Sequence, residues 1–345
     1  MNYFGLLPKY RVDRELTRAE LDTQLRQSER IDFEPRYQGC VISMNSTYLE
    51  SVDKWYDWRG HLSFFTLPMM GIPSAFMSAM ACTSIMQMEE WRMSSYDLEI
   101  LAISASFLSI MLLAFTWLIK RDWFAYTHYP IRFNRKKRVV HVFRTDGTVL
   151  SAPWDEIHFA LGEMYQLGAY EVRGHVLKPD TKMIQDTFAL SYIGSLPMPD
   201  VKNRPIAVEL DVVRLHWEFI RRYMEEGPEA VSHQVQFCLP IDGRRESFRG
   251  GMERMFGDIT ALPLILHVIF WPLCIVVSLH RFIAMRSSKI PIWPEEVEKA
   301  CEIEPDDPYA IVGNENGIRV AVFPEAAAAA GVRFRPPVNR YTGRK

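Results

Sequence analysis

Three long stretches without a charged side chain interrupt an otherwise polar chain, at residues 62–88, 100–119 and 259–279. An α-helix rises 1.5 Å per residue, so about 20 apolar residues cover a hydrocarbon core of roughly 30 Å. The first two stretches are separated by a short link. We therefore predict a membrane protein with a transmembrane helical hairpin over residues 61–120.

Charged residues are distributed unevenly around this hairpin. The link between its helices is acidic, whereas the segment after the second helix is basic, with Lys120, Arg121, Arg132, Arg135, Lys136, Lys137 and Arg138. Because Lys and Arg close to membrane helices stay on the cytoplasmic side, we predict that the tip lies outside and both ends in the cytoplasm. The same seven residues are candidate contacts for anionic lipid headgroups, each worth about 1 kcal/mol near the surface.

Aromatic residues gather near both ends of the hairpin. Tyr and Trp favour the headgroup layer of a bilayer, so we predict an interfacial role for Trp55, Tyr56, Trp58, Trp117 and Trp123. Residues 1–60, before the hairpin, are polar and are predicted to be a cytoplasmic N-terminal segment. It contains a short helix within Leu16–Arg30, where Thr17 and Glu20 have capping-box spacing.

Residues 121–256 have the pattern of a cytoplasmic β-rich domain. Short apolar runs predict strands near residues 129–134, 138–144, 148–152, 157–162, 168–177 and 184–191. The pair Asp146-Gly147 between two β-branched runs indicates a hairpin turn. Residues 207–226 have helical spacing of apolar positions. A strand meander closed by one helix predicts an antiparallel pleckstrin-homology-like (PH-like) barrel, with another small antiparallel α+β module as the alternative.

The third apolar run defines a third membrane segment, residues 257–283, whose path the pattern leaves open. Pro263 and Pro272 interrupt the run, and basic residues flank it almost equally on both sides. It could span the bilayer, which would put the Pro-rich tail 284–345 outside. It could instead re-enter or lie in the interface as half-helices broken at Pro272, which would keep the tail in the cytoplasm.

Composition narrows the function classes. The chain has 345 residues with 40 basic and 42 acidic side chains, and this formal charge of −2 excludes a globally basic nucleic-acid binder. The mean hydropathy of −0.09 places most residues in water. Five dispersed cysteines without a CxxC pair indicate neither a disulfide framework nor a zinc site.

Catalytic signatures are missing from the sequence. There is no GxSxG, P-loop, HExxH or dinucleotide-binding motif. His175 and Asp180 match the H-x4-D spacing of some acyltransferases but fall across a predicted turn, so we interpret the match as chance. We therefore predict no catalytic, cofactor-binding or metal-binding residues and no cofactor.

Several separate blocks of the sequence resemble a known family. They are NSTYLESVDKWYDWRG, RFNRKKRVVHVFRTDGTVLSAPWDEI, EVRGHV, QDTFAL and RSSKIPIWPEEVEKACEIEPDDPY. Together they cover roughly residues 40–310 and resemble a proteobacterial inner-membrane family built on a domain of unknown function. Its members are often encoded near type VI secretion genes. The resemblance implies an accessory or immunity-like role and brings no catalytic residues.

These observations lead to one working hypothesis and two alternatives. We expect a non-enzymatic, multi-pass protein of the bacterial inner membrane that acts through protein partners. It would be an adaptor or immunity protein linked to type VI secretion. The alternatives are a membrane-embedded lipid-acting enzyme using polar groups near Pro68–Ser78 and His267, and a subunit of a small-molecule transporter.

Overall fold

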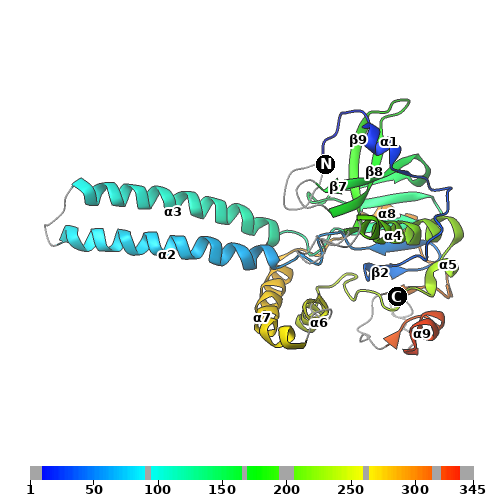
Figure 1. The fold of residues 1–345 in the computed structure, drawn as a ribbon. Helices are drawn as coiled ribbons and strands as arrows, with labels where there is room; N and C mark the ends of the chain where they lie inside the picture. The colour runs from blue at the N-terminus through cyan, green and yellow to red at the C-terminus, as the bar shows by residue number, and fades with distance from the viewer. Residues whose placement is uncertain are drawn as a thin grey trace. The chain divides into compact units, whose positions relative to one another are not determined.

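A computed structural model describes residues 10–89, 95–164, 169–193, 206–258, 264–312 and 320–334. The chain divides into two compact units. Unit 1 comprises Met1–Tyr56, His128–Arg244 and Ile290–Lys345, and unit 2 comprises Asp57–Thr127 and Arg245–Lys289. Both stretches of unit 2 are therefore insertions into the sequence of unit 1 (Figure 1).

The described part of unit 1 contains two antiparallel sheets. The six-stranded sheet has the order β10-β2-β3-β4-β5-β6, and the four-stranded sheet has the order β1-β7-β8-β9. The strands of the first sheet are β2 (Val41–Met44), β3 (Tyr48–Ser51), β4 (Ile131–Asn134), β5 (Val139–Phe143), β6 (Val149–Pro153) and β10 (Ile311–Val312). Those of the second are β1 (Gln24–Leu25), β7 (Ile157–Met164), β8 (Ala169–Leu177) and β9 (Ile184–Ile193).

The other elements of unit 1 are mostly short. The helices are α1 (Arg18–Asp22), α4 (Ile206–Glu226), α5 (Glu229–Ser232), α8 (Glu295–Ala300), α9 (Pro324–Ala330) and the 3₁₀ turn η1 (Trp154–Glu156). A small parallel pair joins β11 (Val320–Ala321) to β12 (Arg333–Phe334). Helix α4 packs against β8 and β9 (Figure 1).

The predicted strands and the long helix of this region are confirmed. Each of the six predicted ranges contains or overlaps one strand, β4 to β9, and the predicted helix 207–226 is α4. The Asp146-Gly147 turn is present, with Gly147 at a φ of +85° and the Asp146 carboxylate accepting a hydrogen bond from the Thr148 amide. Positive φ is the reason that glycine suits this position.

Large aromatic side chains fill the core between the two sheets and α4. Trp154 stacks on Trp217 with ring centroids 5.6 Å apart, and Phe159 lies 4.6 Å from Trp217. All three side chains are fully buried. Because η1, β7 and α4 each supply one ring, this cluster ties the turn between the sheets to the helix that covers them.

The two ends of the chain belong to unit 1, although we predicted 1–60 and 284–345 as segments of their own. Residues 10–36, which we call the N-terminal strap, pair with the second sheet through β1, while β10 pairs with β2. The capping box is confirmed, since the Thr17 hydroxyl accepts from the Glu20 amide, but its helix α1 has only five residues. Short polar segments are difficult to place from sequence because their partners lie far along the chain.

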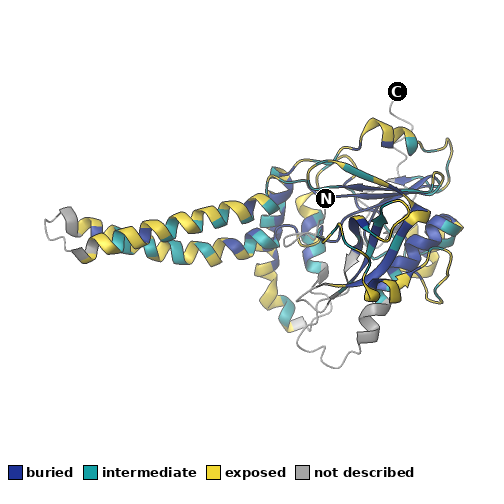
Figure 2. Cartoon of the chain, turned by 90° about the horizontal axis from the view of Figure 1, so that it is seen from above, coloured by how far each residue is buried: buried dark blue, intermediate teal, exposed yellow. Residues whose placement is uncertain are grey.

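Unit 2 contains four helices among its described residues: α2 (His61–Glu89), α3 (Ser95–Asp122), α6 (Phe248–Asp258) and α7 (Leu264–Ser287). Of these, α2, α3 and α7 are long and apolar enough to cross a membrane. Most side chains on α2 and α3 are exposed or half-buried (Figure 2), as expected for helices that present apolar residues to lipid. Compatibility with a membrane protein is thus confirmed by length and composition.

Prolines do not break these helices. Pro68 and Pro73 lie inside α2, and Pro272 lies inside α7. The half-helices predicted at Pro272 are therefore wrong, because one continuous helix passes through that residue. Membrane-type helices tolerate proline when neighbouring groups satisfy the freed carbonyl. The predicted residues 259–263 lie outside the described part of the chain.

A buried polar network joins the helices of unit 2 at the start of α2. The Asp122 carboxylate accepts hydrogen bonds from the Gly60 amide at 3.1 Å and the Ser63 amide at 3.0 Å. The Arg281 guanidinium, on α7, donates to Glu246 at 2.6 Å and to the Arg59 carbonyl at 3.4 Å. Arg281 is fully buried, so the network fixes α7 against the first residues of α2.

Gly60 provides a test of this junction. Its φ is +87°, and a methyl group there would collide with the Arg281 backbone. We expect Gly60→Ala to destabilise unit 2 by at least about 1–3 kcal/mol, because a left-handed residue acquires a side chain without space for it. Gly71→Ala, inside α2 and with open space around the site, should be neutral or stabilising. Thermal aggregation of the two detergent-solubilised variants measures the difference; equal melting temperatures would contradict it.

Candidate functional site

A pocket opens at the seam between the two sheets of unit 1. Its walls are mainly apolar, and its polar residues either follow β3 and β5 or lie on β9. The lining residues are Asp53, Lys54, Trp55, Tyr129, Ile131, Val142, Phe143, Arg144, Leu150, Asp186, Thr187, Phe188 and Ala189. Arg144 and Asp186 form an ion pair across it, from β5's end to β9. The pocket therefore combines an apolar interior with a charged border.

Lys54, which lines the pocket, is held in a buried charge cluster. Its ammonium pairs with the Glu171 carboxylate and donates to the Tyr10 hydroxyl at 2.8 Å. Arg173 donates to Glu171 at 2.7 Å, and the Tyr10 hydroxyl donates to it at 2.8 Å. Burial lowers the pKa of Lys54 against the opposing effect of Glu171. Burial alone would raise the pKa of Glu171, but the charges of Lys54 and Arg173 hold it below its usual value.

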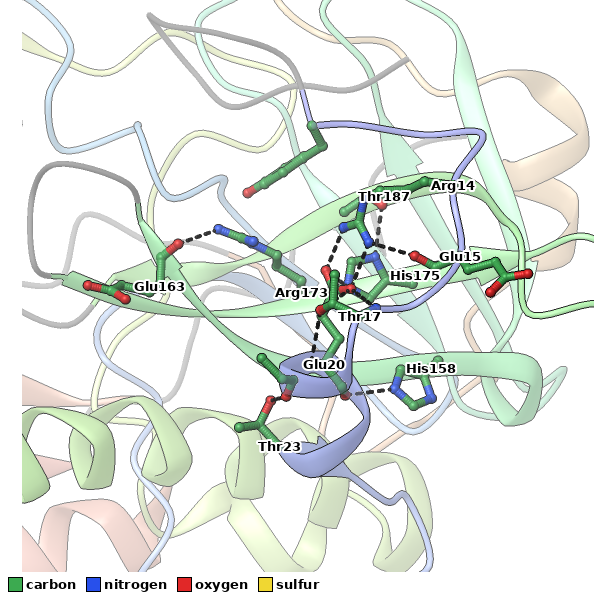
Figure 3. A network of polar contacts seen from close by, with 12 residues as sticks. Arg14, Glu15, Thr17, Glu20, Thr23, His158, Glu163, Arg173, His175 and Thr187 are labelled. Carbon is green, nitrogen blue, oxygen red and sulfur yellow. Dashed lines mark hydrogen bonds and ion pairs between the residues drawn. The ribbon is translucent and has the colours of Figure 1, made fainter.

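A second cluster joins the strap to the same sheet (Figure 3). Glu20, at α1, forms a bidentate pair with Arg14 at 2.6 and 2.7 Å and lies 3.5 Å from His175 Nε2. His175 Nδ1 lies 2.9 Å from the Thr187 hydroxyl, which belongs to the pocket lining. The hydrogen bonds from Arg14 and Thr17 outweigh burial and lower the pKa of Glu20 to about 2. Burial lowers the pKa of His175 to about 4, so the imidazole is neutral at pH 7.

One strand supplies the polar residues of both clusters. Glu171, Arg173 and His175 alternate along β8, and alternation places them on one face of the sheet. Tyr10 and Glu20 of the strap contact Glu171 and His175 on this face. The sequence pattern predicted this strand, but it did not indicate that Lys54, Glu171 and Arg173 form one buried cluster. The alternation of polar residues in EVRGH was a usable signal for a polar face. No pattern in the sequence indicated that the strap covers this face and buries it.

A polar row crosses the outer face of the six-stranded sheet. Glu50, Arg132, His141 and Ser151 are direct cross-strand neighbours on β3, β4, β5 and β6. Arg132 pairs with Glu50 at 2.7 Å, and the His141 Nδ1 atom lies 2.7 Å from the Ser151 hydroxyl. This serine and histidine have the spacing of a nucleophile and its base.

The surroundings of His141 oppose that chemistry. Burial and then the neighbouring Arg132 charge lower the pKa of His141 to about 4, which makes it a weak base at neutral pH. Its other ring nitrogen, Nε2, is buried and has no hydrogen-bond partner in the described part of the chain, whereas a triad needs a carboxylate there. Among the described residues, no three His, Cys, Asp or Glu side chains are placed to hold a metal ion.

The seven predicted headgroup contacts are divided between the two units. Lys120 and Arg121 end α3 in unit 2, where Lys120 is exposed and Arg121 stacks on the Trp117 ring at 3.9 Å. In unit 1, Arg132 is only 3% exposed, so its placement at a membrane surface is corrected: it is part of the sheet's polar row.

The remaining basic residues lie on the turn between β4 and β5. Lys136 pairs with Glu304, and Arg138 pairs with Asp155 and Glu225. Arg135 is half-buried and Lys137 is exposed. Much of this positive charge is therefore balanced within unit 1, and a sequence run of four bases overstates the charge that a membrane would meet.

The predicted interfacial aromatic residues are likewise divided between the two units. Trp58 and Trp117, in unit 2, are 39% and 54% exposed, and Trp123 is half-buried. Tyr56 is 1% exposed and lies against the His128 ring inside unit 1, so its predicted interfacial placement is corrected. Trp55 lines the pocket.

The buried Lys54–Glu171 pair yields a stability prediction. We expect Glu171→Gln to lower the unfolding free energy by about 3–5 kcal/mol, because Lys54 and Arg173 both lose their carboxylate partner in the interior. Adding Lys54→Met should recover part of that loss. The control, Lys178→Met, breaks the exposed Lys178–Asp13 pair and should cost less than about 1 kcal/mol. Denaturant unfolding of the solubilised chain followed by tryptophan fluorescence tests this; similar losses in the two single variants would contradict it.

Acid stability should depend on three buried histidines. Burial lowers the pKa values of His141, His175 and His216 to about 4 each, whereas an unfolded imidazole has a pKa of about 6.5. The unfolded state therefore takes up protons first, and stability is lost as the pH falls from about 6.5 to 4. Each histidine adds about 1.4 kcal/mol per pH unit to the slope. His175→Asn should reduce the slope of unfolding free energy against pH by that amount; an unchanged slope would contradict the assignment.

Comparisons with known proteins give one match. The family of unknown function DUF6708 matches residues 108–305, which is more than half of the chain and runs from the middle of α3 to the residues after α8. No curated protein matches. No solved structure matches either. On the strength of the family match, the chain belongs to DUF6708, a family of unknown function.

Proposed function

We propose that this chain is a non-enzymatic binding protein that holds a partner protein at a membrane. Unit 1 is the binding module and the helices of unit 2 are its anchor. The finer setting that we propose is the inner membrane of a bacterium, with unit 1 in the cytoplasm. The charge asymmetry around α2 and α3 supports that orientation.

The way in which the anchor leaves the module supports this proposal. Strands β3 and β4 are direct antiparallel neighbours, with Ser51 opposite Ile131 and Tyr48 opposite Asn134. The whole α2–α3 hairpin is inserted between them. Two chain segments therefore connect the module to its anchor, one after β3 and one before β4, whereas a module at a flexible terminus would have one connection.

The observation that carries the proposal is the apolar pocket beside β9. One edge of β9 pairs with β8, and the strap covers the other edge only at Ile184, which bonds to Asp13 and Arg14. Farther along β9, Phe188 and Leu190 are buried, with 5% and 0% of their surface exposed. The pocket is adjacent, lined by residues 186–189. A partner segment could insert an apolar side chain into this pocket, whose charged border would orient the segment.

We also propose that unit 1 is PH-like. Four strands, β3–β6, lie in one sheet, three, β7–β9, lie in the next, and α4 follows. This order supports the interpretation, as does the packing of α4 against the second sheet. The PH-like fold is a frequent scaffold for binding and hosts many partners, so it adds no specific ligand.

The sequence blocks that resemble a type VI secretion-linked family lead us to propose an adaptor or immunity role in bacterial antagonism. An immunity protein needs a surface that binds one toxin segment, and the pocket beside β9 is our candidate for that surface. The balanced ion pairs of unit 1 support binding over catalysis, since Arg138, Lys54 and Glu171 already have partners within the fold.

The test is an interbacterial competition between a strain lacking this gene and its secretion-active parent. We expect the strain to be killed, and wild-type protein to restore survival. Ala189→Trp fills the pocket and should abolish protection at unchanged membrane levels. Gln185→Trp, on an exposed position of the same strand outside the pocket lining, should protect like the wild type. Survival of the deletion strain would contradict the immunity role.

A binding measurement tests the β9 surface directly. A photo-crosslinking phenylalanine analogue in place of Trp55, in the pocket, should give a single product in cells, and Ala189→Trp should remove it. The same analogue at Phe33, exposed on unit 1 outside the pocket lining, should give no such product. A product from both positions, or one that persists in Ala189→Trp, would place the partner elsewhere.

A further inference from the structure

Segments on both sides of α6 and α7 fold into the same unit. After α7, the Trp293 indole donates to Glu50 at 3.1 Å, and Glu298 lies 3.3 Å from Arg132. The Asn134 amide donates to the Ala300 carbonyl at 2.7 Å, and Ile311 pairs with Met44 in the six-stranded sheet. Residues 290–312 therefore complete a sheet whose other strands all precede α6.

One folded unit lies on one side of a membrane, so the number of crossings between its segments must be even. The α2–α3 hairpin satisfies this rule, because two crossings separate β3 from β4. Between Arg244 and Ile290, α7 is the single described helix long and apolar enough to cross. One crossing there would place β10 and β2 on opposite faces, although they pair.

Helix α6 cannot supply the second crossing. Its 11 residues rise about 16 Å, roughly half of a hydrocarbon core. It runs antiparallel along α7, with Phe248 5.6 Å from Phe282 and Phe256 6.5 Å from Trp271. The side chains of Arg249 and Glu253 on α6 are 86% and 43% exposed. Charges beside α7 would be costly in lipid, so this part of α7 does not lie across the hydrocarbon.

Helix α7 has two distinct faces. One stripe is buried against α6 and the start of α2: Cys274, Val277, Ser278, Arg281, Ala284 and Met285. The opposite stripe is exposed and apolar along the helix: Ile265, Val268, Ile269, Val276, Leu279 and Ile283. Within the described residues, α7 meets the hairpin only near the first turns of α2, through contacts such as Phe64 with His280 (Figure 1).

We infer that α7 does not cross the membrane but lies in the plane of the bilayer interface, with its exposed stripe in the boundary between headgroups and acyl chains. The occupant of that stripe is phospholipid. Helix α7 packs through its buried stripe on the base of α2, an apolar helix long enough to span a membrane. The exposed Lys120 and Arg286 suit anionic headgroups. The tail after α7 then shares a side with β4–β9. This inference is independent of the partner proposed above.

Side-specific labelling of the full chain tests the even number of crossings. In a background with the exposed Cys82 replaced by Ser, Asp146→Cys precedes α7 and Glu325→Cys follows it, both at exposed positions of unit 1. Neither should react with an impermeant thiol reagent in intact cells, and both should react after permeabilisation. Reaction of one and not the other in intact cells would overturn the inference.

Depth measurement distinguishes an interfacial helix from every other arrangement. Spin labels at Ile269→Cys, Val276→Cys and Ile283→Cys, in purified protein reconstituted in anionic vesicles, should report one shallow depth of about 5–10 Å below the headgroups. The matched control, Arg249→Cys on α6, should report the aqueous side. Depths that change steadily along α7 would indicate a span. Water-exposed or protein-covered labels would indicate that phospholipid is not the occupant. Either result overturns the inference.

Discussion

Pairing between β3 and β4 is the constraint on which the rest of the molecule depends. These strands are neighbours in the sheet but are separated in sequence by the entire helical hairpin. The buried Glu50–Arg132 ion pair lies in this register, and Trp293 and Glu298 bond to it from beyond α7. A single cross-strand contact therefore joins three distant parts of the chain. Because all three belong to one folded unit, any membrane crossings between them must be even in number.

Buried charge has a structural role throughout unit 1. Lys54, Glu171 and Arg173 satisfy one another beneath the strap, and Glu20 does the same with Arg14. Replacing one member of a buried ion pair lowers the unfolding free energy more than replacing both members with apolar residues, because a single replacement leaves the partner buried and unpaired. These clusters attach the N-terminal strap to the second sheet and leave an apolar seam beside β9. The pocket that we propose as a binding site thus lies beside charges that hold the fold together.

Unit 2 shows how one apolar sequence pattern can serve two arrangements. Helices α2 and α3 pack on each other and are otherwise exposed, as a hairpin in lipid would be. Helix α7 has similar composition but is covered on one side by α6, an amphipathic helix with exposed charges. Hydrophobicity measures the preference of a segment for lipid, whereas its orientation depends on what packs beside it. The buried Arg281 makes this difference concrete, since it ties α7 to the start of α2.

The sequence by itself determined the local elements. Period-two and helical patterns located β4 to β9, α4 and the three apolar helices, and Thr17 with Glu20 located a cap, because each signal depends on neighbours a few residues away. Tertiary structure decided what these elements do. Tyr56 and Arg132 are buried, and Arg138 is paired with Asp155 and Glu225. Lys54 contacts Glu171, and residues 290–312 contribute β10 to the first sheet. Those outcomes depend on contacts between residues far apart in the chain, and spacing along a sequence contains no information about which distant partner a charge or an aromatic ring will meet.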